Sequence, residues 1–120
     1  MARVLALGLD PRAVNPDSIP GLTPEIVQAY IDTQLDHVRA AGHTVESCLV
    51  GTDAGAEAML RRKLDRQPFD CVLIGAGLRA PEHLRLFERL LNVIHRTAAQ
   101  ASICFNTTPA DSAEAVQRWV

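Results

Sequence analysis

The chain has 120 residues, of which 48% are hydrophobic and 22% are charged, and its formal net charge is -2 at pH 7. This composition predicts a single globular domain over residues 1–120, large enough to bury a core without disulfides or metals. The weakly acidic charge offers no basic patch for nucleic acid or an anionic membrane surface, and the apolar runs are shorter than the roughly 18 residues of a membrane span. We therefore expect a cytoplasmic protein with no nucleic-acid partner and no membrane partner.

The first predicted elements are a strand and a long helix. Residues 4–9 form an apolar run that stops at Asp10, and a turn-rich stretch follows up to Leu22. Thr23 has the features of a helix N-cap, because proline and an acid come next, and Gly42 is a typical C-terminal stop. The residues expected on the buried face of this helix are Ile26, Val27, Tyr30, Ile31, Leu35 and Val38.

Two strands and a helix are predicted in the middle of the chain. Residues 44–50 form the second strand, and Gly51-Thr52-Asp53 is expected to cap a helix that Pro68 closes. Residues 71–74 are short and fully apolar, which is typical of a buried strand in a parallel sheet. A glycine turn beginning at Gly75 follows this strand.

The last part of the chain predicts two helices around a fourth strand. The helix over residues 81–97 has an apolar arc wider than a helix that covers a sheet requires. Such a face is more often part of the core, and the alternative for so wide an arc is a homodimer contact. The apolar residues of this arc are Leu84, Leu86, Phe87, Leu90, Leu91, Val93 and Ile94. Residues 102–106 form the fourth strand, and Thr108 with Asp111 predicts the capping box of a final helix.

Strands and helices alternate along the chain, with connections long enough for right-handed crossovers. The expected fold class is α/β, with a four-stranded parallel sheet in the order 2-1-3-4 and helices on both faces. This is a three-layer sandwich of the flavodoxin-like or Rossmann-like kind. Strand order reverses between the first and third strands, so we expect a ligand crevice at their carboxyl ends, beside Asp10 and Gly75.

The turn Gly75-Ala76-Gly77 and the guanidinium of Arg79 suit a phosphate or a carboxylate, because backbone N–H groups and arginine both donate to anions. The alternative is that the glycines only make the turn and Arg79 lies in solvent. His83 is a candidate acid or base, and its alternative is a surface histidine. No catalytic residue is assigned, and neither a metal nor a cofactor is expected. The predicted ligand site comprises Asp10, Gly75, Ala76, Gly77, Arg79, His83, Asn106 and Thr107.

The pattern resembles a response-regulator receiver domain. Residues 67–74, which read Gln-Pro-Phe-Asp-Cys-Val-Leu-Ile, are similar to the third strand of that family, and residues 101–107 are similar to its fourth strand ending in threonine. The phosphoacceptor aspartate falls on Gly75, and the acid pair that holds Mg²⁺ is reduced to Asp10. The fifth strand with its lysine is missing, and Thr107 alone carries over. The resemblance implies a degenerate receiver without aspartate phosphorylation.

Two functions are expected from these observations. The first is a non-enzymatic module that self-associates as a homo-oligomer or binds a partner, as a degenerate receiver does. The alternative is a binder of, or a weak enzyme on, a small anionic ligand such as a phosphate or carboxylate at the strand-end crevice. In that case Arg79→Ala should abolish stabilisation by the ligand and leave the fold intact.

Overall fold

The computed structural model describes residues 1–14 and 21–120, so part of the turn-rich stretch predicted after Asp10 lies outside the described residues. The main elements are β1 (Arg3–Leu9), α1 (Pro24–Ala40), β2 (Thr44–Val50), α2 (Ala56–Arg66), β3 (Cys71–Ile74), α3 (Leu84–Thr97), β4 (Ser102–Phe105) and α4 (Ser112–Gln117). Short 3-10 turns are η1 (Pro11–Ala13), η2 (Ala76–Arg79), η3 (Pro81–His83) and η4 (Pro109–Asp111). None of the helices among the described residues is long and apolar enough to cross a membrane.

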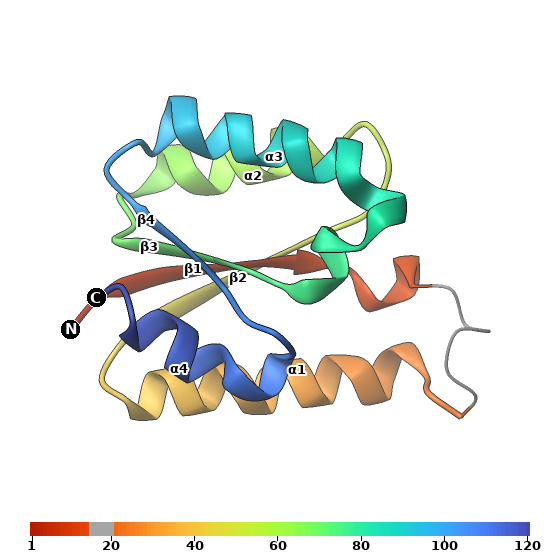
Figure 1. Ribbon diagram of the computed structural model, residues 1–120, viewed down its shortest axis with the longest axis horizontal. Helices are drawn as coiled ribbons and strands as arrows, with labels where there is room; N and C mark the ends of the chain where they lie inside the picture. Colours follow the sequence, from red (N-terminus) through yellow and green to blue (C-terminus); the bar gives the residue numbers. More distant parts are fainter. Residues whose placement is uncertain (15–20) are drawn as a thin grey trace.

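The four strands form one parallel sheet in the order β2-β1-β3-β4, which confirms the predicted strand order. In this register Leu7 of β1 lies between Cys48 of β2 and Ile74 of β3. The reversal of strand order therefore falls between β1 and β3, as expected. The four carboxyl ends point toward the same edge of the molecule (Figure 1).

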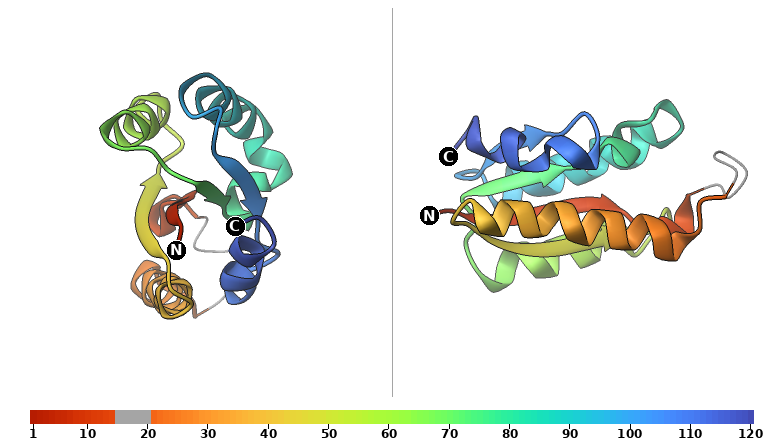
Figure 2. Two further views of the ribbon diagram at one scale, coloured as in Figure 1. Left: turned by 90° about the vertical axis from the view of Figure 1, so that its left-hand side faces the viewer. Right: turned by 90° about the horizontal axis from the view of Figure 1, so that it is seen from below.

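Helices cover both faces of the sheet, with α2 and α3 on one side and α1 and α4 on the other (Figures 1 and 2). Alternate residues of β1 divide between the two cores, because successive side chains in a strand point to opposite faces. Leu5 and Leu7 pack in the core under α2 and α3, whereas Val4 and Ala6 pack in the core under α1 and α4. All four residues of β3 are buried, which accounts for its unbroken apolar sequence.

Local signals at the ends of α1 are confirmed. The side chain of Thr23 accepts a hydrogen bond from the backbone N–H of Ile26 at 3.2 Å. Gly42 has a φ of 102°, the left-handed conformation in which glycine ends helices at little steric cost.

The predicted starts of α2 and α3 are wrong by about one turn. Asp53 does not cap α2, because its Oδ1 accepts from the N–H of Gly55 at 2.9 Å and Gly55 is the N-cap. At α3, Pro81–His83 forms the separate turn η3, and the α-helix begins only at Leu84. In both places a short turn forms backbone hydrogen bonds of its own before the α-helix begins.

The buried face of α1 also differs from the prediction. Ile26 and Tyr30 are 51% and 44% exposed, whereas Gln34, which the apolar pattern leaves out, is half-buried beside the core. Leu35 and Val38 are buried, and Val27 and Ile31 are partly buried, as predicted. The sheet therefore contacts the side of α1 that carries these four residues and Gln34. This orientation of α1 places the polar side chain of Gln34 near the carboxyl ends of the strands.

Candidate functional site

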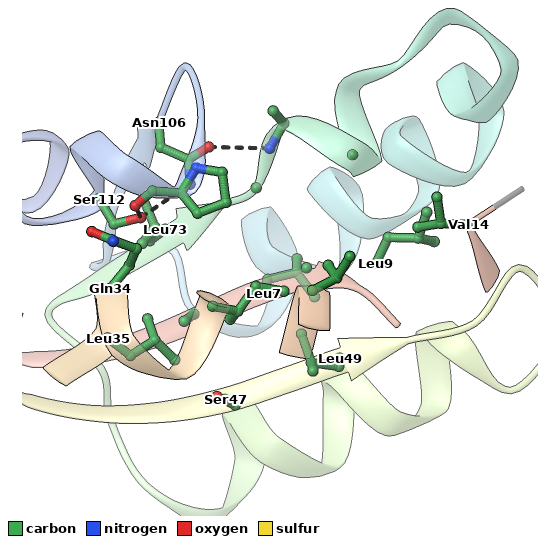
Figure 3. A pocket seen from close by; sticks show the side chains of 18 residues that line it. Leu7, Leu9, Val14, Gln34, Leu35, Ser47, Leu49, Leu73, Asn106 and Ser112 are labelled. Carbon is green, nitrogen blue, oxygen red and sulfur yellow. Dashed lines mark hydrogen bonds between the residues drawn. The ribbon is translucent and has the colours of Figure 1, made fainter. Parts of the chain in front are cut away.

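A cavity of about 170 Å³ lies at the carboxyl ends of β1 and β3, between the sheet and helices α1 and α4 (Figure 3). It occupies the position where strand order reverses. The two crossovers leave β1 and β3 in opposite directions there, so their connections do not fill the space between them.

The cavity exists because the sheet floor carries small residues at this point. Ala6 and Gly8 of β1 and Ser47 of β2 face α1, and Gly75 follows β3 on the same side. A helix packs at a distance set by the larger side chains elsewhere along it. The small residues at the strand ends therefore leave a gap beneath Ile31.

One end of the cavity is polar. Asn106, which is only 5% exposed, accepts from the N–H of Ala76 at 3.1 Å and donates its Nδ2 to Ser112 Oγ at 3.1 Å. Ser112 in turn donates to the carbonyl oxygen of Pro109 at 2.8 Å. These bonds fix the carboxamide of Asn106 and leave one further N–H and one lone pair of that group for a ligand.

Gln34 of α1 also borders the polar end, and its Oε1 lies 3.2 Å from Nδ1 of His37. In the view of Figure 3, Gln34 lies at the same end as Asn106. Leu9, Val14 and Leu49 line the opposite, apolar end. None of the lining residues in the described part of the chain carries a charged side chain.

Arg79 lies outside this lining and makes structural contacts. Its guanidinium donates to the backbone carbonyls of Ile74 and Asn106, at the ends of β3 and β4. It also lies over the ring of Phe105, 5.0 Å from the centroid. Burial lowers the pKa of Arg79, and the negative charge of Asp111 opposes this shift. Arg79 therefore ties two strand ends together.

The remaining predicted residues also have local roles. Asp10 Oδ1 accepts from the N–H of Arg12 at 2.9 Å and caps η1. Thr107 donates its backbone N–H and its hydroxyl to Asp111, at 2.8 and 2.7 Å. His83 is half-buried at the start of α3 and borders a separate hollow. The predicted residues that do line the cavity are Gly75, Ala76, Gly77 and Asn106.

The three polar residues that sequence reasoning missed are Gln34, Ser47 and Ser112. Gln34 interrupts an apolar helical face, and Ser47 occupies an inward position in its strand. Both patterns are visible in the sequence and indicate a polar group near a core. Ser112 has no such signal, because the capping box before it explains a serine at that place.

Comparison with models of known protein families and with curated proteins gave no match. The resemblance to receiver domains therefore stays a prediction from the sequence pattern. In the described part of the chain, no group of three or more His, Cys, Asp or Glu side chains is placed to hold a metal ion.

Proposed function

We propose that this protein binds a small, uncharged and largely apolar molecule in the cavity at the carboxyl ends of β1 and β3. The observation that carries this proposal is the lining itself. It combines an apolar end with a polar end built on the fixed carboxamide of Asn106, without a charged side chain among the described residues.

The size of the cavity limits the ligand. An apolar cavity of about 150 Å³ in another protein holds one benzene molecule. At about 170 Å³, this cavity suits one ring or a short branched chain with a single hydrogen-bonding group. That group would meet Asn106 or Gln34, and the apolar body would contact Leu9 and Leu49.

The lining residues that the structure describes carry no charged side chain, which favours a neutral ligand. A carboxylate or phosphate that enters an apolar cavity loses its hydration, and only a paired counter-charge compensates for that loss. Arg79 is the cation nearest in sequence to the glycine turn, and it already donates to the carbonyls of Ile74 and Asn106. A neutral ligand has no such cost.

The same lining favours binding without catalysis. General acid–base and nucleophilic catalysis require a titratable or activated side chain within hydrogen-bond distance of the reacting atoms. The polar side chains here are carboxamides and hydroxyls, and the Ser112 hydroxyl already donates to a backbone carbonyl. We therefore propose a binding module.

Neutral and charged one-ring compounds test the proposal by isothermal titration calorimetry. Benzamide and benzoate form the matched pair of neutral and charged probes, and phenol and benzylammonium are a second neutral and a second charged one-ring probe. We expect saturable binding of a neutral probe and binding of the charged probes at least tenfold weaker, about 1.4 kcal/mol. Ala6→Leu fills the floor of the cavity and should remove binding, whereas Ala58→Leu, an exposed position on α2, should not.

Two results would overturn the proposal. If benzoate or inorganic phosphate binds more tightly than the neutral probes, and Arg79→Ala removes that binding, the anionic ligand expected from the sequence is the better account. If no probe shows saturable binding in the wild-type protein, the cavity is not a binding site for molecules of this class.

Self-association is the second candidate function, and two exposed apolar side chains, Leu84 of α3 and Phe105 of β4, favour it. Most of the wide apolar arc of α3 packs in the core. Its buried residues are Leu86, Leu90, Val93 and Ile94. Leu84 stays 63% exposed, and Phe105 on the edge strand β4 is 42% exposed.

Sedimentation velocity at micromolar concentration tests this candidate. Self-association through the surface around Leu84 would be supported if the wild-type protein is a dimer, Leu84→Glu dissociates it, and Met59→Glu on α2 does not. A wild-type protein that sediments as a monomer would contradict it.

A further inference from the structure

Two of the three cysteines lie together in the core under α1 and α4. Cys71 is on β3 and Cys104 is on the adjacent strand β4, with their Sγ atoms 3.3 Å apart. Cys48 belongs to the other core, on the opposite face of the sheet. Only one pair of thiols is therefore placed to react within the native fold.

We propose that Cys71 and Cys104 form a reversible disulfide when the protein is exposed to a peroxide, and that this pair is an oxidation-sensitive modification site. The bond would join the first residue of β3 to the third residue of β4 within the core under α1 and α4. It would form within one chain and would not involve Cys48.

The register shows what the reaction requires of the backbone. Cys71 is opposite Ser102 and Cys104 is opposite Leu73, so the two cysteines are diagonal neighbours. Strands about 4.8 Å apart with a rise of about 3.3 Å per residue place such Cα atoms roughly 8 Å apart. Disulfides usually span about 4.4–6.8 Å between Cα atoms, so β4 must shift along β3.

The elements around the pair permit that shift. β4 is an edge strand of four residues, paired on one side only, and a strand of this kind moves more easily than a central one. The hydrogen bonds from Arg79 to the carbonyls of Ile74 and Asn106 oppose the shift and must adjust during it. Ala115 and Val116 of α4, which has six residues, lie in the same core cluster as the thiols. Local opening of so short a helix would admit a molecule the size of hydrogen peroxide.

The two thiols are in hydrogen-bond contact, and either sulfur can be the donor. This contact favours ionisation of one thiol of the pair, and the thiolate so formed is the first nucleophile. The thiolate attacks one oxygen of the peroxide, which breaks the O–O bond and gives a sulfenic acid and a hydroxide. The hydroxide takes up the proton that the thiol released and becomes the first water. The thiol of the other cysteine then attacks the sulfenic sulfur, and its proton leaves with the displaced hydroxyl group as the second water. In total, two thiols and one hydrogen peroxide give one disulfide and two waters.

Cys48 is the internal control. Burial raises its pKa to about 11, and the other two cysteines lie across the sheet from it. At neutral pH it should stay a thiol during mild oxidation. Whether Cys48 stays reduced therefore distinguishes a reaction in the native fold from random disulfide pairing in unfolded chains.

The experiment is peroxide treatment of the folded protein, followed by blocking of free thiols and non-reducing tryptic mass spectrometry. We expect residues 67–79 linked to residues 97–118 and a reduced, blocked peptide over residues 40–61. The link should disappear on treatment with dithiothreitol. It should be absent in Cys71→Ser and in Cys104→Ser, and it should persist in Cys48→Ser.

Two outcomes would overturn the proposal. In the first, all three cysteines remain thiols, or Cys71 proceeds to sulfinic acid without linkage. In the second, links that involve Cys48 form as readily as the expected one, which would show pairing in unfolded chains. Circular dichroism of the treated sample before proteolysis shows whether the fold was retained.

Discussion

Arg79 holds the ends of β3 and β4 together through two charged hydrogen bonds and its contact with Phe105. The carbonyl oxygens of Ile74 and Asn106 would lose these donors in Arg79→Ala. Hydrogen bonds to charged groups contribute about 1.5–3 kcal/mol, and partial exposure reduces that figure. We expect Arg79→Ala to lower the free energy of unfolding by about 2 kcal/mol.

Urea denaturation measures this change. Arg85→Ala, at an exposed position of α3, is the matched control and should change the free energy by less than about 0.5 kcal/mol. An Arg79→Ala variant as stable as the wild type would show that the strand-end contacts of this residue contribute little. The guanidinium of Arg79 would then be available to donate hydrogen bonds to a ligand.

Gln34 contributes polarity to the cavity without supporting the core. Gln34→Met keeps the length of the side chain and removes its carboxamide, so we expect weaker binding of phenol and benzamide with little change in thermal stability. Gln28→Met on the same helix lies outside the cavity lining and is the control. Equal affinities for the wild type and Gln34→Met would exclude a contact between this carboxamide and the ligand.

Helix α4 illustrates stabilisation at the scale of an element. It has six residues, too few to form a stable helix in isolation, and the capping box between Thr108 and Asp111 begins the turn that leads into it. The side-chain hydrogen bond from Thr107, with further backbone N–H donors, lowers the pKa of Asp111 below its ordinary value of 3.8.

This pKa shift predicts a dependence of stability on pH. A carboxylate whose pKa is lowered by folding stabilises the native state above its unfolded pKa, and the contribution is lost as pH falls through the folded pKa. We expect Asp111→Asn to destabilise the protein at pH 7 and to have a smaller effect near pH 3. Denaturant melts of both proteins at the two pH values give the comparison, and an equal effect at both would rule out the carboxylate charge as the cause.

Elements with strong local signals were predicted well. The strands over 44–50 and 71–74 have the predicted bounds, and the cap at Thr23 forms as expected. The predicted capping box between Thr108 and Asp111 also forms, but it caps η4, and α4 begins one turn later at Ser112. The starts of α2 and α3 were wrong because proline and glycine turns before them adopt short 3-10 or Asp-capped geometries. Sequence periodicity does not distinguish these turns from the first turn of an α-helix.

At the scale of the whole molecule, the candidate site combines residues that no local pattern joins. Gly75 and Asn106 were predicted at the strand ends, and both line the cavity. The cavity itself depends on how α1 packs over the small residues Ala6 and Ser47, which lie far from it in the sequence or on another element. Four of the predicted site residues therefore line the cavity, whereas Arg79 lies outside its lining and donates to two backbone carbonyls.

The most direct measurement for the neutral-ligand proposal is a ¹H–¹⁵N NMR titration of the wild-type protein with phenol and, separately, with benzoate. We predict that phenol shifts the side-chain amide signals of Asn106 and Gln34 and the backbone signals of Ala6 and Gly75 along saturable curves, while benzoate leaves them nearly unchanged. Shifts confined to other surfaces, or a stronger response to benzoate at the same residues, would contradict the account.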